Sequence, residues 1–266
     1  MSRGNKKNYH KNPFEAERLR ASLASHKDYS ALEKTYKEDS YQEINDLNLP
    51  EMWDSLNNRP NLNRSANPMG YHRLSIVSNL IFGNKKRVLN VGCGAGDLEN
   101  ILSLSGKLKK LDWLGIDISS RSINVLKKRF PKSNFKVKKV EKIKYDEVYF
   151  DYVIVLEVLE HIKPHQVLIT LRQLNRVLKK GGELIVSVPL NEGLEEMIKQ
   201  GKNPNAHVRI YTPDLIRAEI EIAGFKILKQ KLLFAFNKYY LLKSFLVKFL
   251  PGFRQPNGII IIAQKP

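Results

Sequence analysis

The sequence has very little cysteine and no long apolar run. Its 266 residues include one cysteine, Cys93, which excludes an internal disulfide and a metal centre built from several Cys and His ligands. An apolar run of about 18 residues, as a transmembrane helix requires, is also missing. The basic N-terminus MSRGNKKNYHKN lacks the apolar core of a secretory signal. These absences predict a cytoplasmic protein in a reducing compartment.

Acidic residues are also scarce in two parts of the chain. Lys and Arg number 45 against 27 Asp and Glu, which gives a formal net charge of +18. Residues 121–144 hold ten basic residues and one acid, Glu141, and the chain after Glu221 holds eight basic residues and no acid. This imbalance favours anionic partners, such as nucleic acid, an anionic lipid surface or a phosphorylated substrate.

The pattern of apolar residues divides the chain into three parts. We expect residues 1–12 to form a disordered basic tail and residues 13–84 a helical N-terminal extension. In residues 85–266, short apolar runs alternate with helical segments, which is typical of a doubly wound α/β fold with a mostly parallel sheet. Five such runs, together with GFKILKQKLLFAF and GIIIIAQK as a closing antiparallel pair, predict a seven-stranded sheet.

The stretch VLNVGCGAGDLE predicts a ligand-binding turn between a strand and a helix. The glycines, Gly92, Gly94 and Gly96, let the backbone approach a ligand closely, and the helix start offers free N–H groups. Asp117 ends the next strand, where a carboxylate can accept hydrogen bonds from both ribose hydroxyls. Asp97 stands where a dinucleotide fingerprint has its last glycine, and its charge would repel a pyrophosphate. We therefore expect a nucleoside ligand without phosphates.

Five blocks of the chain resemble the class I S-adenosylmethionine (SAM)-dependent methyltransferases, with their Rossmann-like fold. They are VLNVGCGAGDLE, GIDISSRSI, YFDYVIVLEVLEHI, LNRVLKKGGELIVSVP and HVRIYTPDLIRAEIEIAGFKIL. The subgroup they resemble most includes ubiquinone-pathway O-methyltransferases and many sugar, lipid and natural-product enzymes. The resemblance implies SAM as the cofactor. It places ten residues around SAM: Asn90, Gly92, Gly94, Gly96, Asp117, Ile118, Val140, Glu141, Leu156 and Glu157.

Two of these positions depart from the family pattern. Asn90 stands where the family often has Asp, so this position is uncharged but can still form hydrogen bonds. Lys139 stands near the place of an Asp that often takes the adenine amino group, which leaves the adenine contacts to Val140 and Glu141.

The run EVLEHI supplies the candidate catalytic residues. His161 follows the fourth predicted strand at the carboxyl edge of the sheet, where open α/β folds bind ligands. As a base it could take the proton from an acceptor hydroxyl, with Glu160 orienting its ring. The alternative is that His161 only caps the loop.

A divalent metal such as Mg²⁺ is a second candidate cofactor. Glu157-x-x-Glu160-His161 resembles the metal-binding run of small-RNA 3′-end 2′-O-methyltransferases and of some ubiquinone-pathway enzymes. The resemblance places His207 at the position of the RNA enzymes' fourth ligand, although the simpler interpretation of His207 as a loop residue is favoured. It precedes a predicted helix start at Thr212 and Pro213. The ligands of a metal therefore stay unassigned.

Three segments are candidates for choosing the methyl acceptor: residues 50–75, a lid at residues 189–210, and an apolar, basic insert at about 236–258. The insert suits a helix in a membrane interface, a lid over an apolar substrate or a dimer contact. The N-terminal extension is expected to cap the acceptor.

Our first functional hypothesis is O-methylation of a small lipid-linked, glycosidic or quinone-like hydroxyl, by a protein peripheral to the inner face of the membrane. RNA methylation, which would use the basic surface, is an alternative. The small number of aromatic residues among the basic ones argues against it, because bases stack on aromatic rings. A SAM-binding protein without catalysis is the third. The oligomeric state is left open.

Overall fold

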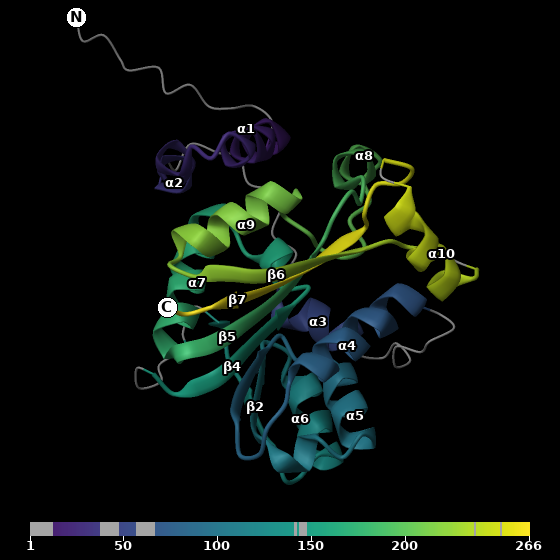
Figure 1. Cartoon of the computed structure of the whole chain (residues 1–266). Helices are drawn as coiled ribbons and strands as arrows, with labels where there is room; N and C mark the ends of the chain where they lie inside the picture. Colours follow the sequence, from purple (N-terminus) through teal and green to yellow (C-terminus); the bar gives the residue numbers. More distant parts are fainter. Residues whose placement is uncertain are drawn as a thin grey trace, which may run out of the picture.

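The computed structural model describes residues 13–37, 48–56, 67–140, 143, 148–236, 238–250 and 252–266, so the predictions for the tail and for Glu141 lie outside these residues. Its centre is a seven-stranded sheet of order β3-β2-β1-β4-β5-β7-β6, with helices on both faces (Figure 1). The strands are β1 (Arg87–Val91), β2 (Asp112–Asp117), β3 (Asn134–Val137), β4 (Phe150–Leu156), β5 (Leu178–Pro189), β6 (Lys226–Leu233) and β7 (Gly258–Gln264). Strands β1 to β5 pair in parallel and β7 runs antiparallel to both of its neighbours, which confirms the predicted fold class and the closing pair.

The described helices fall into an N-terminal group and a group that connects or follows the strands. The first group is α1 (Pro13–Ser25), α2 (Tyr29–Lys37), α3 (Pro50–Leu56) and α4 (Pro68–Leu80). The second is α5 (Asp97–Leu104), α6 (Ser120–Arg129), α7 (Pro164–Val177), α8 (Leu194–Lys199), α9 (Pro213–Ile222) and α10 (Tyr240–Leu246). Short 3₁₀ turns occur at η1 (Leu108–Lys110), η3 (Leu159–His161) and η4 (Val247–Phe249).

The central strands bury both of their faces, which explains their continuous apolar sequences. On β1, Val88 packs into a core beneath α4, α5 and α6, whereas Leu89 enters the core beneath α2, α7 and α9. On β4, Ile154 and Val155 divide between the two cores in the same way. A strand with period-two side chains is apolar throughout only when helices cover both sides.

The parallel strands place the ends of several connections at one edge of the sheet. The glycine turn follows β1, Asp117 ends β2 and the run EVLEHI follows β4, so all of them meet at the carboxyl edge. Pro189 and Leu233, the last residues of β5 and β6, both pair with Gly258 at the start of β7. The insert that contains α10 therefore leaves and rejoins the sheet at this same edge.

A buried charge network fastens α1 and α2 to α9. Arg209 donates to Glu219 at 2.5 Å and to the hydroxyl of Tyr36 at 3.1 Å, and Tyr36 also donates to Glu219. Glu17 and Arg20 on α1 pair beside this group, and their side chains are almost fully buried. Because buried charges are tolerated only when paired, this network fixes how the N-terminal helices sit on the sheet.

Two local predictions have clear outcomes. Thr212 caps α9 by accepting from the N–H of Leu215, and Pro213 is the first helical residue, as predicted. The helix predicted for the insert is short, because α10 ends at Leu246 and the chain turns through η4 to Gly252, whose φ is 83°. None of the helices within the described ranges has the length and apolar character needed to cross a bilayer.

Candidate active site

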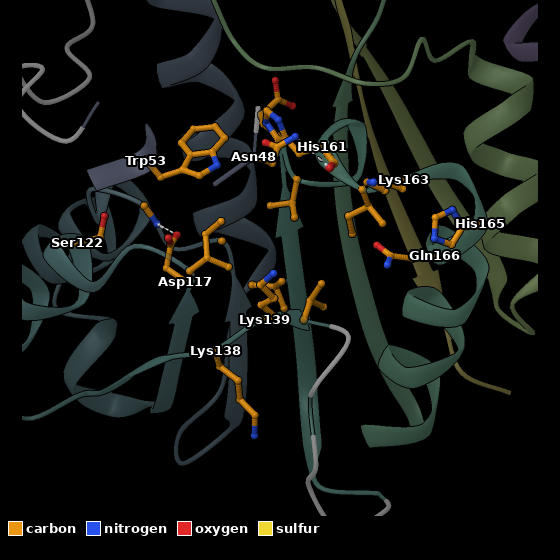
Figure 2. Close-up of a pocket in the computed structure, with 18 residues that line it drawn as sticks. Asn48, Trp53, Asp117, Ser122, Lys138, Lys139, His161, Lys163, His165 and Gln166 are labelled. Atoms are coloured by element: carbon orange, nitrogen blue, oxygen red, sulfur yellow. Dashed lines mark hydrogen bonds between the residues drawn. The ribbon is translucent and has the colours of Figure 1, made fainter. Parts of the chain in front are cut away.

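A cavity of about 470 Å³ opens at the carboxyl edge of the sheet (Figure 2). Its lining combines residues from the turns after β1, β2, β3 and β4 with residues from the N-terminal extension. A volume of this size is in the range of sites that bury a small organic ligand. The predicted residues that line it are Gly92, Gly94, Asp117, Ile118, Val140, Glu157 and His161.

The three glycines of the first turn serve different purposes. A Cβ on Gly92 would lie 2.4 Å from Val158, and a Cβ on Gly96 would lie 2.2 Å from Leu126, so both positions are needed for packing. A Cβ on Gly94 would meet no atom within 4 Å, because this glycine borders the open cavity. Gly94 is therefore the position where a ligand can approach the backbone.

Asp117 is held by the turn that it faces. Its carboxylate accepts from the N–H groups of Gly94 and Ser119, each at 2.8 Å. Burial raises the pKa of Asp117, while these two N–H groups act in the opposite direction. A carboxylate has about four lone-pair sites, so two remain for the vicinal hydroxyls of a ribose.

Three of the residues predicted to touch SAM do not line the cavity: Asn90, Gly96 and Leu156. Asn90 lies behind the glycine turn, where its amide donates to Glu99 at 2.8 Å. The indole of Trp113 donates to the same oxygen of Glu99 at 3.1 Å, and burial raises the pKa of Glu99 to about 7. Asn90 thus supports the turn from below instead of facing the ligand.

The N-terminal extension supplies one wall of the cavity. Asn48 and Trp53 line it, and the Trp53 ring meets the His161 ring edge-on at 4.9 Å between centroids. Asp54 fastens this wall, because it accepts from the Ser119 hydroxyl at 2.6 Å and from the N–H of Arg121 at 3.1 Å. Sequence reasoning placed Trp53 among the acceptor-side residues but missed Asn48, which carries no motif.

Glu157 follows β4 in a constrained conformation. Its φ is 54°, a left-handed backbone that non-glycine residues rarely adopt and that often marks a functional site. Ser187 donates to one of its oxygens at 2.8 Å, and Arg73 on α4 forms an ion pair with the other at 2.7 Å. The carboxylate is therefore fixed at the cavity wall.

His161, His207 and Glu160 form a cluster beside the cavity. The rings of His161 and His207 lie 4.8 Å apart between centroids, and Nε2 of each is 3.9 Å from the same Oε1 of Glu160. Glu160 is fully buried, and neither of its oxygens has a hydrogen-bond partner among the described residues. Glu160 does not orient His161 by a hydrogen bond; the carbonyl oxygen of Ala206 does so, at 3.2 Å from Nδ1.

The outer partners of the two rings fix where their protons lie. The Ala206 carbonyl can only accept, so Nδ1 of His161 carries the proton and Nε2 keeps a lone pair. Nδ1 of His207 lies 2.6 Å from Glu192, which gives its ring the same tautomer. Burial, reinforced by His207, lowers the pKa of His161 to about 3, so the ring is neutral near pH 7. Two nitrogen lone pairs therefore converge on the carboxyl group of Glu160, whose pKa burial raises well above its usual range.

The turn after β3 and the start of α7 add basic residues to the cavity wall. Lys138, Lys139, Lys163 and His165 all line it, and Figure 2 shows the first two along one side and the other two on another. Lys139 occupies the predicted adenine end, where Val140 is buried. Of the basic stretch at residues 121–144, two residues therefore line the cavity. Most of its other basic residues lie on α6 and on the edge strand β3.

Comparison with known proteins identifies the family of this chain. A family model described as "Methyltransferase domain" matches residues 63–230, which is more than half of the chain. The chain therefore belongs to this family of methyltransferase domains, and its fold is that of the class I SAM-dependent methyltransferases.

Two relatives show how far the similarity extends. A ubiquinone biosynthesis O-methyltransferase of Coxiella burnetii is 30% identical over 119 residues, which cover 43% of this chain and 48% of the relative. An uncharacterized protein of Methanocaldococcus jannaschii is 32% identical over 150 residues, covering 55% and 58%. The chain thus spans about half the length of the curated relatives it matches.

Solved structures share the fold at lower identity. A SAM-dependent methyltransferase from Archaeoglobus fulgidus superposes with a TM-score of 0.57 at 19% identity, covering 74% of this chain and 94% of that one. Phosphoethanolamine N-methyltransferase 2 of Haemonchus contortus, in complex with SAM, gives 0.56 at 19% identity, covering 73% and 52%.

Proposed function

We propose that this protein transfers the methyl group of SAM to a hydroxyl of a small lipid-linked, glycosidic or quinone-like acceptor. The observation that carries the proposal is the lone pair on Nε2 of His161, beside a cavity that also presents the Gly94–Asp117 cradle. The O-methyltransferase activity in the name of the Coxiella burnetii relative supports an oxygen acceptor.

The proposed transfer is a direct displacement at the methyl carbon. The acceptor oxygen forms a bond to the methyl carbon while the carbon–sulfur bond breaks, and the electron pair stays on sulfur to give S-adenosylhomocysteine. The hydroxyl proton passes through Nε2 of His161 to solvent, because a ring with a pKa of about 3 does not retain it near pH 7. Holding the two reactants in line can supply on the order of 7–11 kcal/mol of the barrier, so positioning matters more than the strength of the base.

Each wall of the cavity has a part in this positioning. Asp117 and Gly94 would hold the ribose, and the fixed carboxylate of Glu157 would attract the positive sulfonium. Trp53 lies against His161 and would exclude water from the acceptor oxygen.

The Glu160–His161–His207 cluster also fits a divalent cation. Nε2 of both rings and a carboxylate oxygen lie within 4.8 Å of one another, and each Nδ1 already has the outer hydrogen-bond partner that metal-binding histidines usually have. Two imidazoles with one carboxylate suit Zn²⁺, Mn²⁺ or Fe²⁺ better than Mg²⁺, which prefers oxygen ligands. A bound cation would lower the pKa of an acceptor hydroxyl and orient it.

The acceptor can be tested with methyl-labelled SAM and a fractionated cell extract. We expect label in the organic-soluble fraction that resists alkali, because methyl ethers are stable where methyl esters release methanol. The variant His161→Gln should lose this label and keep its affinity for SAM, while the matched control His26→Gln, an exposed histidine in the turn after α1, should label normally. RNase-sensitive label would instead establish RNA as the acceptor.

The cation can be tested without an activity assay. We expect one tightly held metal ion per chain by elemental analysis, and a fall in the melting temperature on chelation. The variant His207→Gln should lose both the metal and the response to chelator. If the protein is purified without metal and its melting temperature does not change on addition of Zn²⁺, Mn²⁺ or Fe²⁺, the cation is excluded and His161 acts without a metal.

A further inference from the structure

The segment from Tyr239 to Phe253 presents apolar side chains to the solvent. Of the nineteen large apolar side chains exposed in the described part of the chain, eight lie here. We call them the α10 patch: Tyr239, Leu241, Leu242, Phe245, Leu246, Phe249, Leu250 and Phe253. Exposed apolar residues gathered in this way mark a surface of interaction, whereas scattered ones do not.

The orientation of α10 makes this exposure unusual. Tyr240 at the start of α10 and Val247 directly after its end are buried, so this segment already has an inner face that packs on the protein. A surface helix of a soluble protein places polar residues on its other side. Here the other side carries Leu241, Leu242 and Phe245, and the nearby Phe249 meets Phe245 edge-on at 5.2 Å between ring centroids.

Basic residues border the patch and acids are missing from it. Lys243 and Arg254 both lie over the ring of Phe236, although they are far apart in the sequence. The charged ends of their side chains are 5.9 and 4.7 Å from its centroid. Lys238, directly before Tyr239 in the sequence, is exposed, and the sequence has no acidic residue after Glu221. Apolar and aromatic side chains bordered by cations are the composition of segments that lie in the interface of an anionic membrane.

We propose that the α10 patch inserts into the interface of an anionic lipid bilayer. Charge disfavours the simplest rival, a symmetric contact with a second copy of the chain, because a two-fold axis through the patch would bring two basic borders together and the segment has no acidic residue to pair with them. The shape agrees, since α10 stands out from the end of the sheet opposite the C-terminus (Figure 1).

The patch is connected to the cavity through α4. The Tyr240 hydroxyl lies 2.9 Å from Nδ1 of His72, and the next residue, Arg73, forms the ion pair with Glu157 at the cavity wall. Since the insert also leaves the carboxyl edge of the sheet, a membrane bound at the patch would lie at the same edge as the cavity. That the methyl acceptor reaches the cavity from this membrane rests on the proposed function, whereas the membrane contact itself does not.

Flotation with lipid vesicles tests the contact without any methyl transfer. We expect the purified protein to float with vesicles of equal parts phosphatidylcholine and phosphatidylglycerol, and to stay behind with pure phosphatidylcholine. The double variant Phe249→Glu/Phe253→Glu should reduce the bound fraction by about tenfold or more, because two apolar anchors are replaced by charges of the wrong sign. The matched control Leu104→Glu, which changes an equally exposed residue on α5, should float like the unchanged protein.

Further measurements on the same variants decide between the outcomes. The double variant should keep its melting temperature and its affinity for SAM, because the substituted rings are 66% and 75% exposed. Equal flotation of the variant and the unchanged protein would overturn the proposal. The proposal would also be overturned if light scattering showed that the unchanged protein is a dimer and the double variant a monomer, and if the unchanged protein did not bind vesicles. If the unchanged protein floats with the vesicles but puts no label into the organic-soluble fraction, only the proposed function is refuted.

Discussion

The backbone N–H of Gly94 donates to the carboxylate of Asp117 across 2.8 Å, which joins the turn after β1 to the end of β2. This bond sets the width of the cofactor cradle. It also leaves the other lone pairs of the carboxylate facing the cavity, where a ribose would lie.

Replacing Asp117 by Asn should weaken SAM binding by about tenfold or more, because hydrogen bonds to a charged group contribute about 1.5–3 kcal/mol each. Titration calorimetry with SAM measures the dissociation constant. The matched control is Asp112→Asn, which changes a half-exposed aspartate at the start of the same strand and should leave the constant unchanged. Equal affinities for all three proteins would show that Asp117 does not hold the cofactor.

Alanine at Gly94 and at Gly96 should have opposite kinds of effect. Gly94→Ala places a methyl group in the open cavity, so we expect a loss of SAM affinity with a destabilisation of only about 1–2 kcal/mol for its left-handed backbone. Gly96→Ala carries the same left-handed backbone penalty and also drives a methyl group into Leu126, so we expect a loss of about 2–4 kcal/mol of stability. Calorimetry and urea unfolding separate the two effects, and identical profiles would contradict the assigned roles.

Glu99 should make the protein less stable as the pH rises. Its pKa is raised from 4.5 to about 7 by burial, so between these values the folded protein binds more protons than the unfolded chain. The free energy of unfolding therefore falls through this window, by on the order of 3 kcal/mol, and changes no further above it. Urea unfolding gives the free energy of unfolding of the wild type and of Glu99→Gln, measured at steps of about one pH unit from pH 4 to pH 8. The variant keeps an oxygen for Asn90 and Trp113, and its curve should lack this fall; parallel curves would mean that Glu99 titrates normally.

Arg209 should be far more important for stability than an exposed arginine at the same interface. Arg209→Met leaves Glu219 buried without its cation, which costs about 3–5 kcal/mol. The control Arg172→Met breaks a pair with Glu33, which also joins α2 to the body of the protein but is partly exposed, and should cost about 1 kcal/mol or less. Equal losses in chemical unfolding would contradict the burial argument.

The sequence predicted the sheet and the glycine turn after its first strand well because both are local patterns. Apolar runs covered on both faces identify the strands, and the glycines before DLENILSL identify the turn and its helix. The place of Asp117 at the end of the next strand then follows from parallel topology. Asn90 was less predictable, because a buried polar side chain on β1 can face the ligand or support the turn, and only the packing of Glu99 and Trp113 decides which.

The sequence by itself determined the class of the protein: a methyltransferase fold, with Gly94 and Asp117 at the carboxyl edge of its sheet. The tertiary structure decided the rest of the site, since it brought His207 against His161, set Trp53 over the same ring and left the apolar face of α10 in solvent. The reason is physical. Periodicity and turn residues are written along the chain, whereas contacts between distant segments depend on how the elements pack, and the buried Arg209 network that follows His207 is part of that packing.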